Sequence, residues 1–242
     1  ISNGGLGWAN EKSLQLVGLY TMAAYTLPLF GAYIADRKIG RSNAVTLGAS
    51  LIIFGHFLML FSYLEELLYI ALALIALGTS FFKPCIPSLL GDLYHPNDTR
   101  RESGFSWYYF GINLGGMIAG ITSGLLFQKF GFQIALASAG LGMIVGIFVF
   151  FSGRQYLNFE TQKKIIFTNI SKPTKMTKNQ INALYCLIIA FGFFAIWATV
   201  YNLALSGTLT LYIEKYTNKE IFGYNIPTTF FMSLDSLTIL FF

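Results

Sequence analysis

The sequence predicts an all-α protein that crosses a membrane several times, and three observations support this fold class. Of the 242 residues, 55% are hydrophobic and only 11% are charged, with a mean hydropathy of +0.59. Soluble domains carry about 25% charged residues. The apolar residues gather in runs of about 20 residues, the length of a spanning helix. The basic residues gather between these runs, so the net charge of +5 does not indicate a nucleic-acid partner.

Seven apolar runs are long enough to be spanning helices. In order, they are Leu14–Ile34, Asn43–Phe61, Leu67–Leu90, Gly104–Phe127, Gln133–Phe151, Ala183–Leu205 and Ile226–Phe242. The chain begins at a residue other than Met and ends inside the last run. We therefore expect it to be a fragment of a longer protein.

Basic residues in the connecting segments predict the orientation of the runs. If the segment after the first run is cytoplasmic, the inner segments hold Arg37, Lys38, Arg41, Arg100, Arg101, Arg154, Lys163, Lys164, Lys172, Lys175 and Lys178. The outer segments then hold Lys12, Lys129, Lys215 and Lys219. Cytoplasmic loops carry the excess of Lys and Arg. We expect a multi-pass protein, in the plasma (inner) membrane, with residue 1 outside.

The longest connection, residues 152–182, holds most of the inner basic residues. We interpret it as a basic cytoplasmic linker between two helical bundles. Residues 1–151 then form an N-terminal bundle of five spans, and residues 183–242 form the start of a C-terminal bundle with two spans.

Lys83 lies in the third run, in the sequence F-F-K-P-C-I-P-S. A charged ammonium group deep in a bilayer costs about 3 kcal/mol or more, and such residues pair with another group or line a wet cavity. The alternative is that the side chain extends to the headgroups. Lys83 is about seven residues from the end of its run, roughly 10 Å along a helix. This depth favours a transporter whose cargo or coupling ion contacts Lys83.

Small residues at four-residue spacing predict close contacts between helices, because they let two backbones approach in lipid. Three such stripes are present, namely Gly111 with Gly115, Gly116 with Gly120 and Gly124, and Gly142 with Gly146. We also expect His56, in the second run, to be packed or hydrogen-bonded rather than to relay protons.

The segment between the first two runs reads G-A-Y-I-A-D-R-K-I-G-R. Its acid can accept charge-assisted bonds from an arginine, and a glycine permits a tight turn. A basic loop that obeys the positive-inside rule is the simpler interpretation. Together, however, these residues resemble the cytoplasmic motif of the major facilitator superfamily, which joins the second and third helices and gates the transporter. The residues that match are Gly31, Asp36, Arg37, Gly40 and Arg41.

A narrower resemblance, to the proton-dependent oligopeptide transporters, covers nearly the whole chain. Phe81–Tyr94 is similar to that family's fourth helix, and Phe105–Gly115 to its fifth-helix signature. Ala195–Ala198 resembles the seventh-helix tryptophan segment, and Phe222–Leu237 the entry to the eighth helix. The chain would then hold family helices two to eight of a major facilitator fold, without the first helix and its E-x-x-E-R motif.

The resemblance implies a substrate site. Lys83 resembles the lysine that meets the peptide carboxylate and takes part in proton coupling, and Asn113 resembles the asparagine that binds the peptide backbone. Tyr109 is one helical turn before Asn113, so the two share a face. Tyr25 and Trp197 resemble cavity-lining aromatic residues of the second and seventh helices. Ordinary packing is the alternative for each aromatic residue.

One departure from the family concerns proton coupling. The family's seventh helix carries a glutamate that pairs with the buried lysine, but no Asp or Glu occurs between Gln162 and Ile213. Asp235 instead stands in the next run, where the family has asparagine. We hypothesise that Asp235 replaces the glutamate as the partner of Lys83, since two unpaired charges in a membrane cost more than a pair. Alternatively, Asp235 faces water.

The resemblance implies proton-coupled uptake of di- and tripeptides by alternating access, with small peptides, protons and the lipid bilayer as partners. Two alternatives remain, namely a transporter of another solute such as an amino acid or nitrate, and an inactive truncated remnant. The sequence shows no nucleophile–base set, phosphate loop or metal-ligand spacing. We therefore expect neither an enzyme nor a cofactor.

Overall fold

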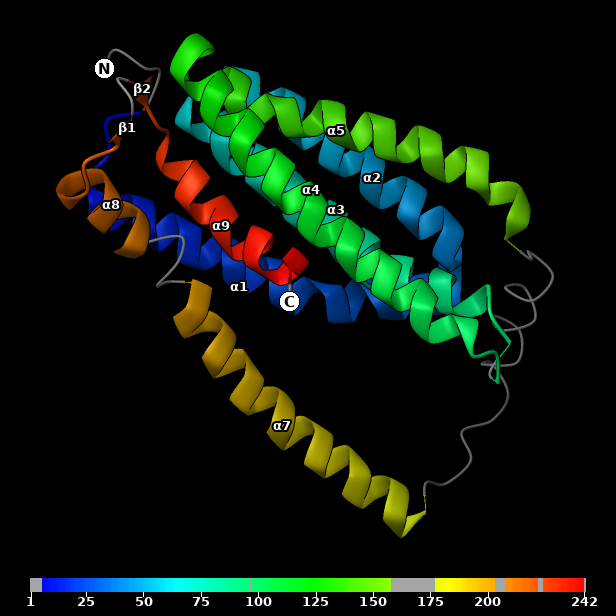
Figure 1. Cartoon of the computed structure of the whole chain (residues 1–242). Coiled ribbons are helices and arrows are strands. Elements are labelled where there is room, and N and C mark those ends of the chain that lie inside the picture. Colours follow the sequence, from blue (N-terminus) through cyan, green and yellow to red (C-terminus); the bar gives the residue numbers. More distant parts are fainter. Residues whose placement is uncertain (1–5, 96, 158–176, 203–207, 222–223, 242) are drawn as a thin grey trace.

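The computed structural model describes residues 6–95, 97–157, 177–202, 208–221 and 224–241, most of them in long helices (Figure 1). The helices are α1 (Asn10–Ile34), η1 (Ala35–Ile39), α2 (Arg41–Leu58), η2 (Met59–Phe61), α3 (Glu65–Asp92), α4 (Arg100–Phe130), α5 (Phe132–Gly153), η3 (Arg154–Tyr156), α7 (Lys178–Asn202), α8 (Thr210–Tyr216) and α9 (Thr228–Phe241). A small antiparallel hairpin joins β1 (Glu220–Ile221) to β2 (Tyr224–Asn225).

The helical membrane fold is confirmed. Among the described residues, five helical stretches are long and apolar enough to cross a membrane, and they coincide with the first five predicted runs. α7 has 25 residues and coincides with the sixth run, while α9 has 14 described residues within the seventh. Most of the predicted linker, residues 158–176, lies outside the described residues.

Two glycines reverse the chain between antiparallel helices. Gly40 separates η1 from α2 with φ 82°, and Gly131 separates α4 from α5 with φ 88°. Side chains other than glycine rarely adopt these positive φ values. The predicted turn at Gly40 is therefore confirmed.

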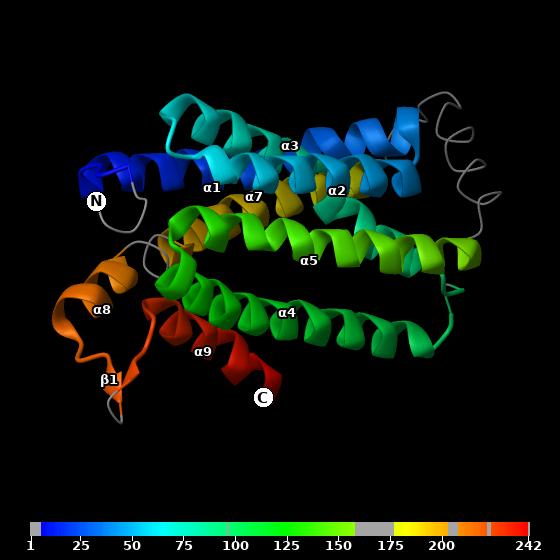
Figure 2. The same cartoon turned by 90° about the horizontal axis from the view of Figure 1, so that it is seen from above.

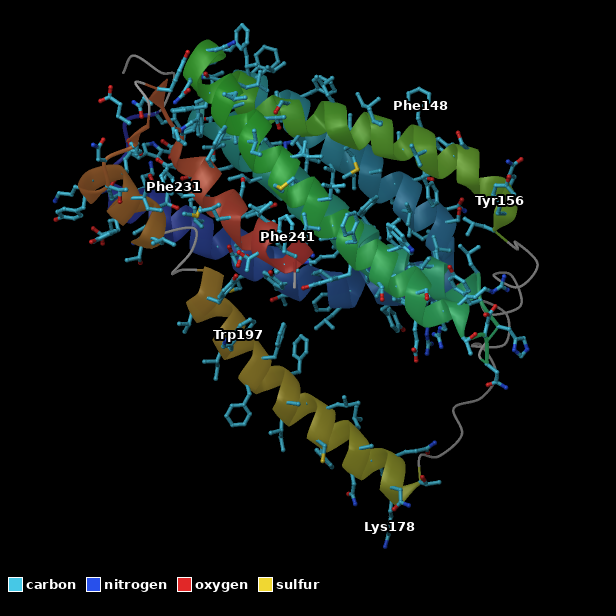
Figure 3. The ribbon with its side chains drawn as sticks, viewed as in Figure 1. Phe148, Tyr156, Lys178, Trp197, Phe231 and Phe241 are labelled. Atoms are coloured by element: carbon cyan, nitrogen blue, oxygen red, sulfur yellow. The ribbon has the colours of Figure 1, made fainter. Side chains whose placement is uncertain are left out.

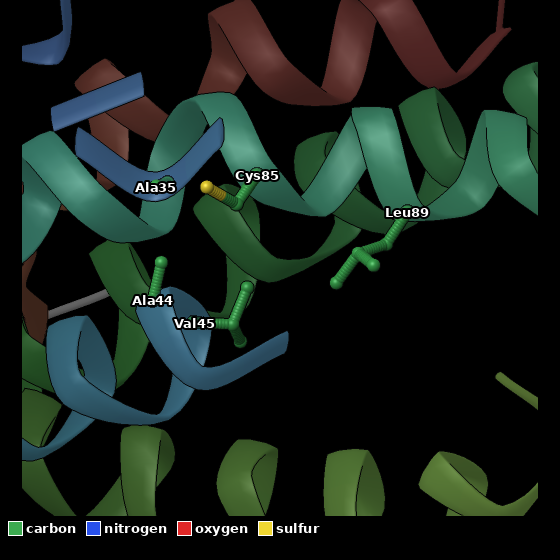
Figure 4. Close-up of a cluster of buried hydrophobic side chains, with 5 residues drawn as sticks. All are labelled: Ala35, Ala44, Val45, Cys85 and Leu89. Atoms are coloured by element: carbon green, nitrogen blue, oxygen red, sulfur yellow. The ribbon is translucent and has the colours of Figure 1, made fainter. Parts of the chain in front are cut away.

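Among the described residues, α2 and α3 share the most extensive helix contact, and their backbones touch. A Cβ atom added at Gly48 would lie 2.6 Å from the carbonyl oxygen of Gly78, and one at Gly55 would lie 2.9 Å from the carbonyl oxygen of Ala71. Such contact stabilises helix pairs in lipid, where no hydrophobic force drives association. At one end of this pair, Figure 4 shows Ala35, Ala44, Val45, Cys85 and Leu89, which form a buried cluster between η1, α2 and α3.

α1 packs on α3 at Gly31, which lies directly against the backbone carbonyl of Ser80. Pro84 lies four residues after Ser80 in α3 and has no N–H, so it cannot donate the usual helix hydrogen bond to this carbonyl. Any side chain at residue 31 would collide with it. Gly31 therefore sets the distance between α1 and α3 at this point.

Among the three predicted small-residue stripes, one is confirmed as a helix contact. Gly116, Gly120 and Gly124 of α4 face Ser236, Ser233 and Thr229 of α9, and the two helices lie side by side in Figures 1 and 2. A Cβ atom at Gly111, Gly115, Gly142 or Gly146 would instead meet open space. His56 is also confirmed as hydrogen-bonded, because its Nδ1 lies 2.9 Å from the carbonyl oxygen of Leu136.

α8 and the β-hairpin were not predicted from the sequence. Hydrogen bonds from this region connect the start of α9 to α8 and to α4. The Glu214 carboxylate accepts hydrogen bonds from Lys219 Nζ at 2.6 Å and from the Thr228 hydroxyl. The side-chain amide of Gln128, near the end of α4, donates to the carbonyl oxygen of Asn225 at 2.9 Å. These contacts fix the entry to α9 relative to both α8 and α4.

We predict that Gly48→Ala destabilises the protein. The added methyl group would overpack the α2–α3 contact, at a cost of about 1–3 kcal/mol. For a chain of this length, the midpoint of thermal unfolding in detergent should fall by roughly 2–10 °C. Gly142→Ala is the matched control, because its methyl group would meet open space. Equal midpoints for the two variants would contradict the described contact.

A second prediction concerns acid and the start of α9. The hydrogen bonds from Lys219 and then Thr228 lower the pKa of Glu214. The stabilisation is therefore complete above the unfolded pKa, about 4.3, and is lost as the pH falls through the lower folded value. The Ile226 amide donates to the carbonyl oxygen of Lys219 at 2.9 Å and reports on this region.

Hydrogen exchange, corrected for the intrinsic rate, should show loss of Ile226 protection below about pH 4. The Gly131 amide, which donates to Phe127 at 3.0 Å, is an internal control. In Glu214→Gln, the protection of Ile226 should be weaker at neutral pH and independent of acid. Equal acid sensitivity of Ile226 in both proteins would assign the effect to another group.

Candidate functional site

Lys83 and Tyr25 meet where α3 faces α1. The Lys83 ammonium lies 4.3 Å from the centre of the Tyr25 ring, a cation–π distance. Lys83 is exposed rather than packed among apolar side chains, and Tyr25 is 45% exposed. An exposed cation on the apolar stretch of α3 fits a surface that contacts water or a ligand rather than lipid tails.

Trp197, Tyr201 and Asp235 form a second group, between α7 and α9. The rings of Trp197 and Tyr201 stack with centres 5.2 Å apart and planes inclined by 15°. The Tyr201 hydroxyl donates a hydrogen bond of 2.9 Å to Asp235 Oδ2. Trp197 lies near the end of α7 opposite Lys178 (Figure 3). The acid of α9 is thus held by an aromatic residue of α7.

α4 places Tyr109 and Asn113 one turn apart, but their environments differ. Tyr109 is 57% exposed. Asn113 is only 8% exposed, and its amide donates to the backbone carbonyl of Tyr109 at 2.9 Å. Tyr109 is therefore available to a ligand. Asn113 is buried, and its amide already donates to the backbone of its own helix.

The structure gives Lys83 and Asp235 separate neighbours. Among the described residues, no ion pair joins them, because the Lys83 ammonium lies over Tyr25 and the Asp235 carboxylate accepts from Tyr201. The predicted pairing between these two charges stays a prediction.

The motif predicted to gate the transporter forms an ionic cluster with α3. Arg41 Nε donates to Asp36 Oδ1 at 2.7 Å, and Arg41 Nη1 donates to Asp92 Oδ2 at 2.9 Å. Arg37 instead lies over the ring of Tyr33, with its guanidinium carbon 5.1 Å from the ring centre. One guanidinium thus connects η1, the start of α2 and the end of α3.

Sequence reasoning missed two residues of these groups. Asp92 ends α3, two residues beyond the third predicted run and at the same membrane face as the motif, and an acid there was the available signal. Tyr201 could not be singled out, because it is one of several polar residues in the stretch where the family's seventh-helix glutamate is missing. For cofactors, the described part of the chain contains no group of three or more His, Cys, Asp or Glu side chains able to hold a metal ion.

Comparison with known proteins gives a consistent set of relatives. The family model described as "PTR2: POT family" matches residues 42–174. An uncharacterized transporter, YclF of Bacillus subtilis, is 38% identical over 148 residues, which are 61% of this chain and 30% of the relative. The peptide transporter YePEPT of Yersinia enterocolitica is 38% identical over 152 residues, or 62% of this chain and 30% of the relative. The matched segment thus spans under a third of these relatives.

Solved structures extend the similarity to nearly the whole chain. A crystal structure of a mutant peptide transporter POT in complex with alafosfalin has a TM-score of 0.75 and 26% identity, and the match covers 99% of this chain and 59% of that one. A POT family transporter in complex with 5-aminolevulinic acid, at 23% identity and a TM-score of 0.73, shares the fold. Because the family model matches more than half of the sequence, the chain belongs to the POT family, whose named members here are membrane transporters.

Proposed function

We propose that this chain is part of a secondary active transporter that takes up di- and tripeptides together with protons by alternating access. The observation that carries the proposal is Lys83, an exposed ammonium on a spanning helix with an aromatic ring 4.3 Å away. A peptide carboxylate is a natural partner for this cation, because a charge-assisted bond would offset the cost of keeping it in the membrane. Membership of the POT family supports peptides as the cargo.

The two groups of residues suggest how a short peptide would be oriented. Lys83 and Tyr25 offer a cation and a ring to the carboxyl end. Asp235, with Tyr201 and Trp197 beside it, offers an acid and aromatic faces to an ammonium group. Tyr109 is exposed on α4 and would contact the middle of the peptide. The varied side chains of peptides require such adaptable contacts around two fixed charges.

Coupling to protons would use the same acid. We propose that Asp235 and Lys83 pair when the site is empty in another conformation, after each leaves its present aromatic neighbour. Protonation of Asp235, or a peptide carboxylate at Lys83, would break the pair and let the two bundles separate. The ionic cluster of Asp36, Arg41 and Asp92 would gate the cytoplasmic side.

A transporter of another small solute is the second candidate. The stretch from Gln162 to Ile213 contains no acid, so the family's seventh-helix partner for lysine is lacking. Competition between dipeptides and free amino acids for uptake would separate the two candidates. A linker between two bundles at residues 152–182 is part of either proposal.

We predict that uptake of labelled dialanine into liposomes needs an inward proton gradient and is lost in Lys83→Ala. The complete reading frame containing this chain should be used, since the chain spans only part of its relatives. Loss of the charge-assisted bond between Lys83 and the peptide carboxylate should reduce uptake by about tenfold or more. Lys178→Ala is the control, because Lys178 begins α7 at the end away from Trp197. Equal uptake by both variants would contradict the role of Lys83.

Asp235→Asn tests the coupling separately. Asparagine keeps the shape and can still bond to Tyr201, but it cannot exchange a proton. We expect gradient-driven accumulation to be abolished, while exchange of labelled for unlabelled dialanine across the membrane continues. The measurement compares the two modes in the same liposomes. Gradient-driven uptake at the unsubstituted rate would refute Asp235 as the coupling acid.

A further inference from the structure

A cavity of about 440 Å³ lies apart from the proposed peptide site, between the end of α3 and the start of α4. Its volume is within the range of small-ligand sites, roughly 300–1,000 Å³. The side chains that matter to its chemistry are Arg41, Ser88, Asp92, Tyr94 and Arg101. The cavity therefore opens at the membrane face where the basic connecting segments gather.

Arg101 provides the cavity with a cation that has no acidic partner in the described part of the chain. No ion pair of the described residues includes Arg101, and its guanidinium carbon lies 5.9 Å from the centre of the Phe105 ring. The neighbouring Arg100 differs, because its Nη2 lies 2.7 Å from Asp98 Oδ2. Two adjacent arginines thus have different roles, and the one beside the cavity is available to an anion.

The rest of the lining favours an anion of moderate size. Arg41 uses Nε for Asp36 and Nη1 for Asp92, which leaves Nη2 outside these ion pairs. Gly91 also lines the cavity, and a Cβ atom there would lie 3.5 Å from Arg101 Nη2. The missing side chain keeps the guanidinium accessible. Tyr94 also lines the cavity, and its hydroxyl is a neutral donor that could bond to the anion beside the two arginines.

We propose that this cavity binds a phosphate group. The fork of an arginine matches two phosphate oxygens, which makes arginine the usual residue for such anions. Asp92 lowers the net positive charge of the lining, so a single phosphate group fits better than a pyrophosphate or another polyanion. Both lipid headgroups and free phosphate carry this group, and basic pockets between helices are typical headgroup sites.

The test uses the whole chain purified in detergent and does not depend on transport. Native mass spectrometry would measure retention of phosphatidic acid against diacylglycerol of the same acyl chains. Thermal unfolding in sodium phosphate against sodium chloride, at equal ionic strength, would measure binding of the free ion. Arg101→Gln removes the proposed ligand, and Arg100→Gln removes an equal charge one residue away. Gly91→Leu fills the cavity and keeps every charge.

We expect Arg101→Gln to weaken binding of the phosphate probe by about tenfold, Gly91→Leu to weaken it similarly, and Arg100→Gln to change it by less than about twofold. Retention of phosphatidic acid alone would identify a headgroup site, and stabilisation by phosphate alone would identify a site for the free ion. Equal losses in Arg100→Gln and Arg101→Gln would show general charge attraction and overturn the proposal. A result in which neither probe binds would also overturn it. Helix content by circular dichroism confirms that each variant is folded.

Discussion

Contact between the backbones of α2 and α3 is the constraint on which the packed part of the molecule depends. A bilayer offers helices no hydrophobic gain for leaving lipid, so dispersion contacts and hydrogen bonds must hold them together. Gly48 and Gly78 bring the two backbones together, and α1 and α5 pack against this pair. The same pair carries Arg41 at the start of α2 and Asp92 at the end of α3, which explains why a single guanidinium can connect three segments.

The two charged residues of the proposed site, Lys83 and Asp235, each lie beside an aromatic residue from a different helix. The Lys83 ammonium faces the ring of Tyr25, and the Asp235 carboxylate accepts a hydrogen bond from Tyr201. Aromatic residues can exchange such partners at low cost, because a tyrosine hydroxyl also bonds to water and a ring face accepts any cation. Lys83 and Asp235 are therefore stabilised by partners that they can exchange at low cost, as the proposed site requires.

The sequence was sufficient to predict the elements that depend on composition and local pattern. The length of the apolar runs predicted the spanning helices, and Gly40 predicted the turn. The sequence around Asp36 and Arg41 predicted their ion pair. Contacts between distant residues were harder to predict. Nothing local indicates that Gly116, Gly120 and Gly124 meet another helix while Gly142 and Gly146 do not, because the partner, α9, lies about 100 residues further on. The α8 turn and the hairpin were missed because they are short and lie between apolar runs.

The packing of Gly31 against the Ser80 carbonyl gives α1 a fixed point of contact with α3. Tyr25 lies about 9 Å to one side of this point along the helix and Asp36 about 8 Å to the other, by the usual rise per residue. The same contact therefore fixes the segments on both sides of it. One carries Tyr25, beside Lys83 of the proposed peptide site, and the other carries Asp36 of the ionic cluster.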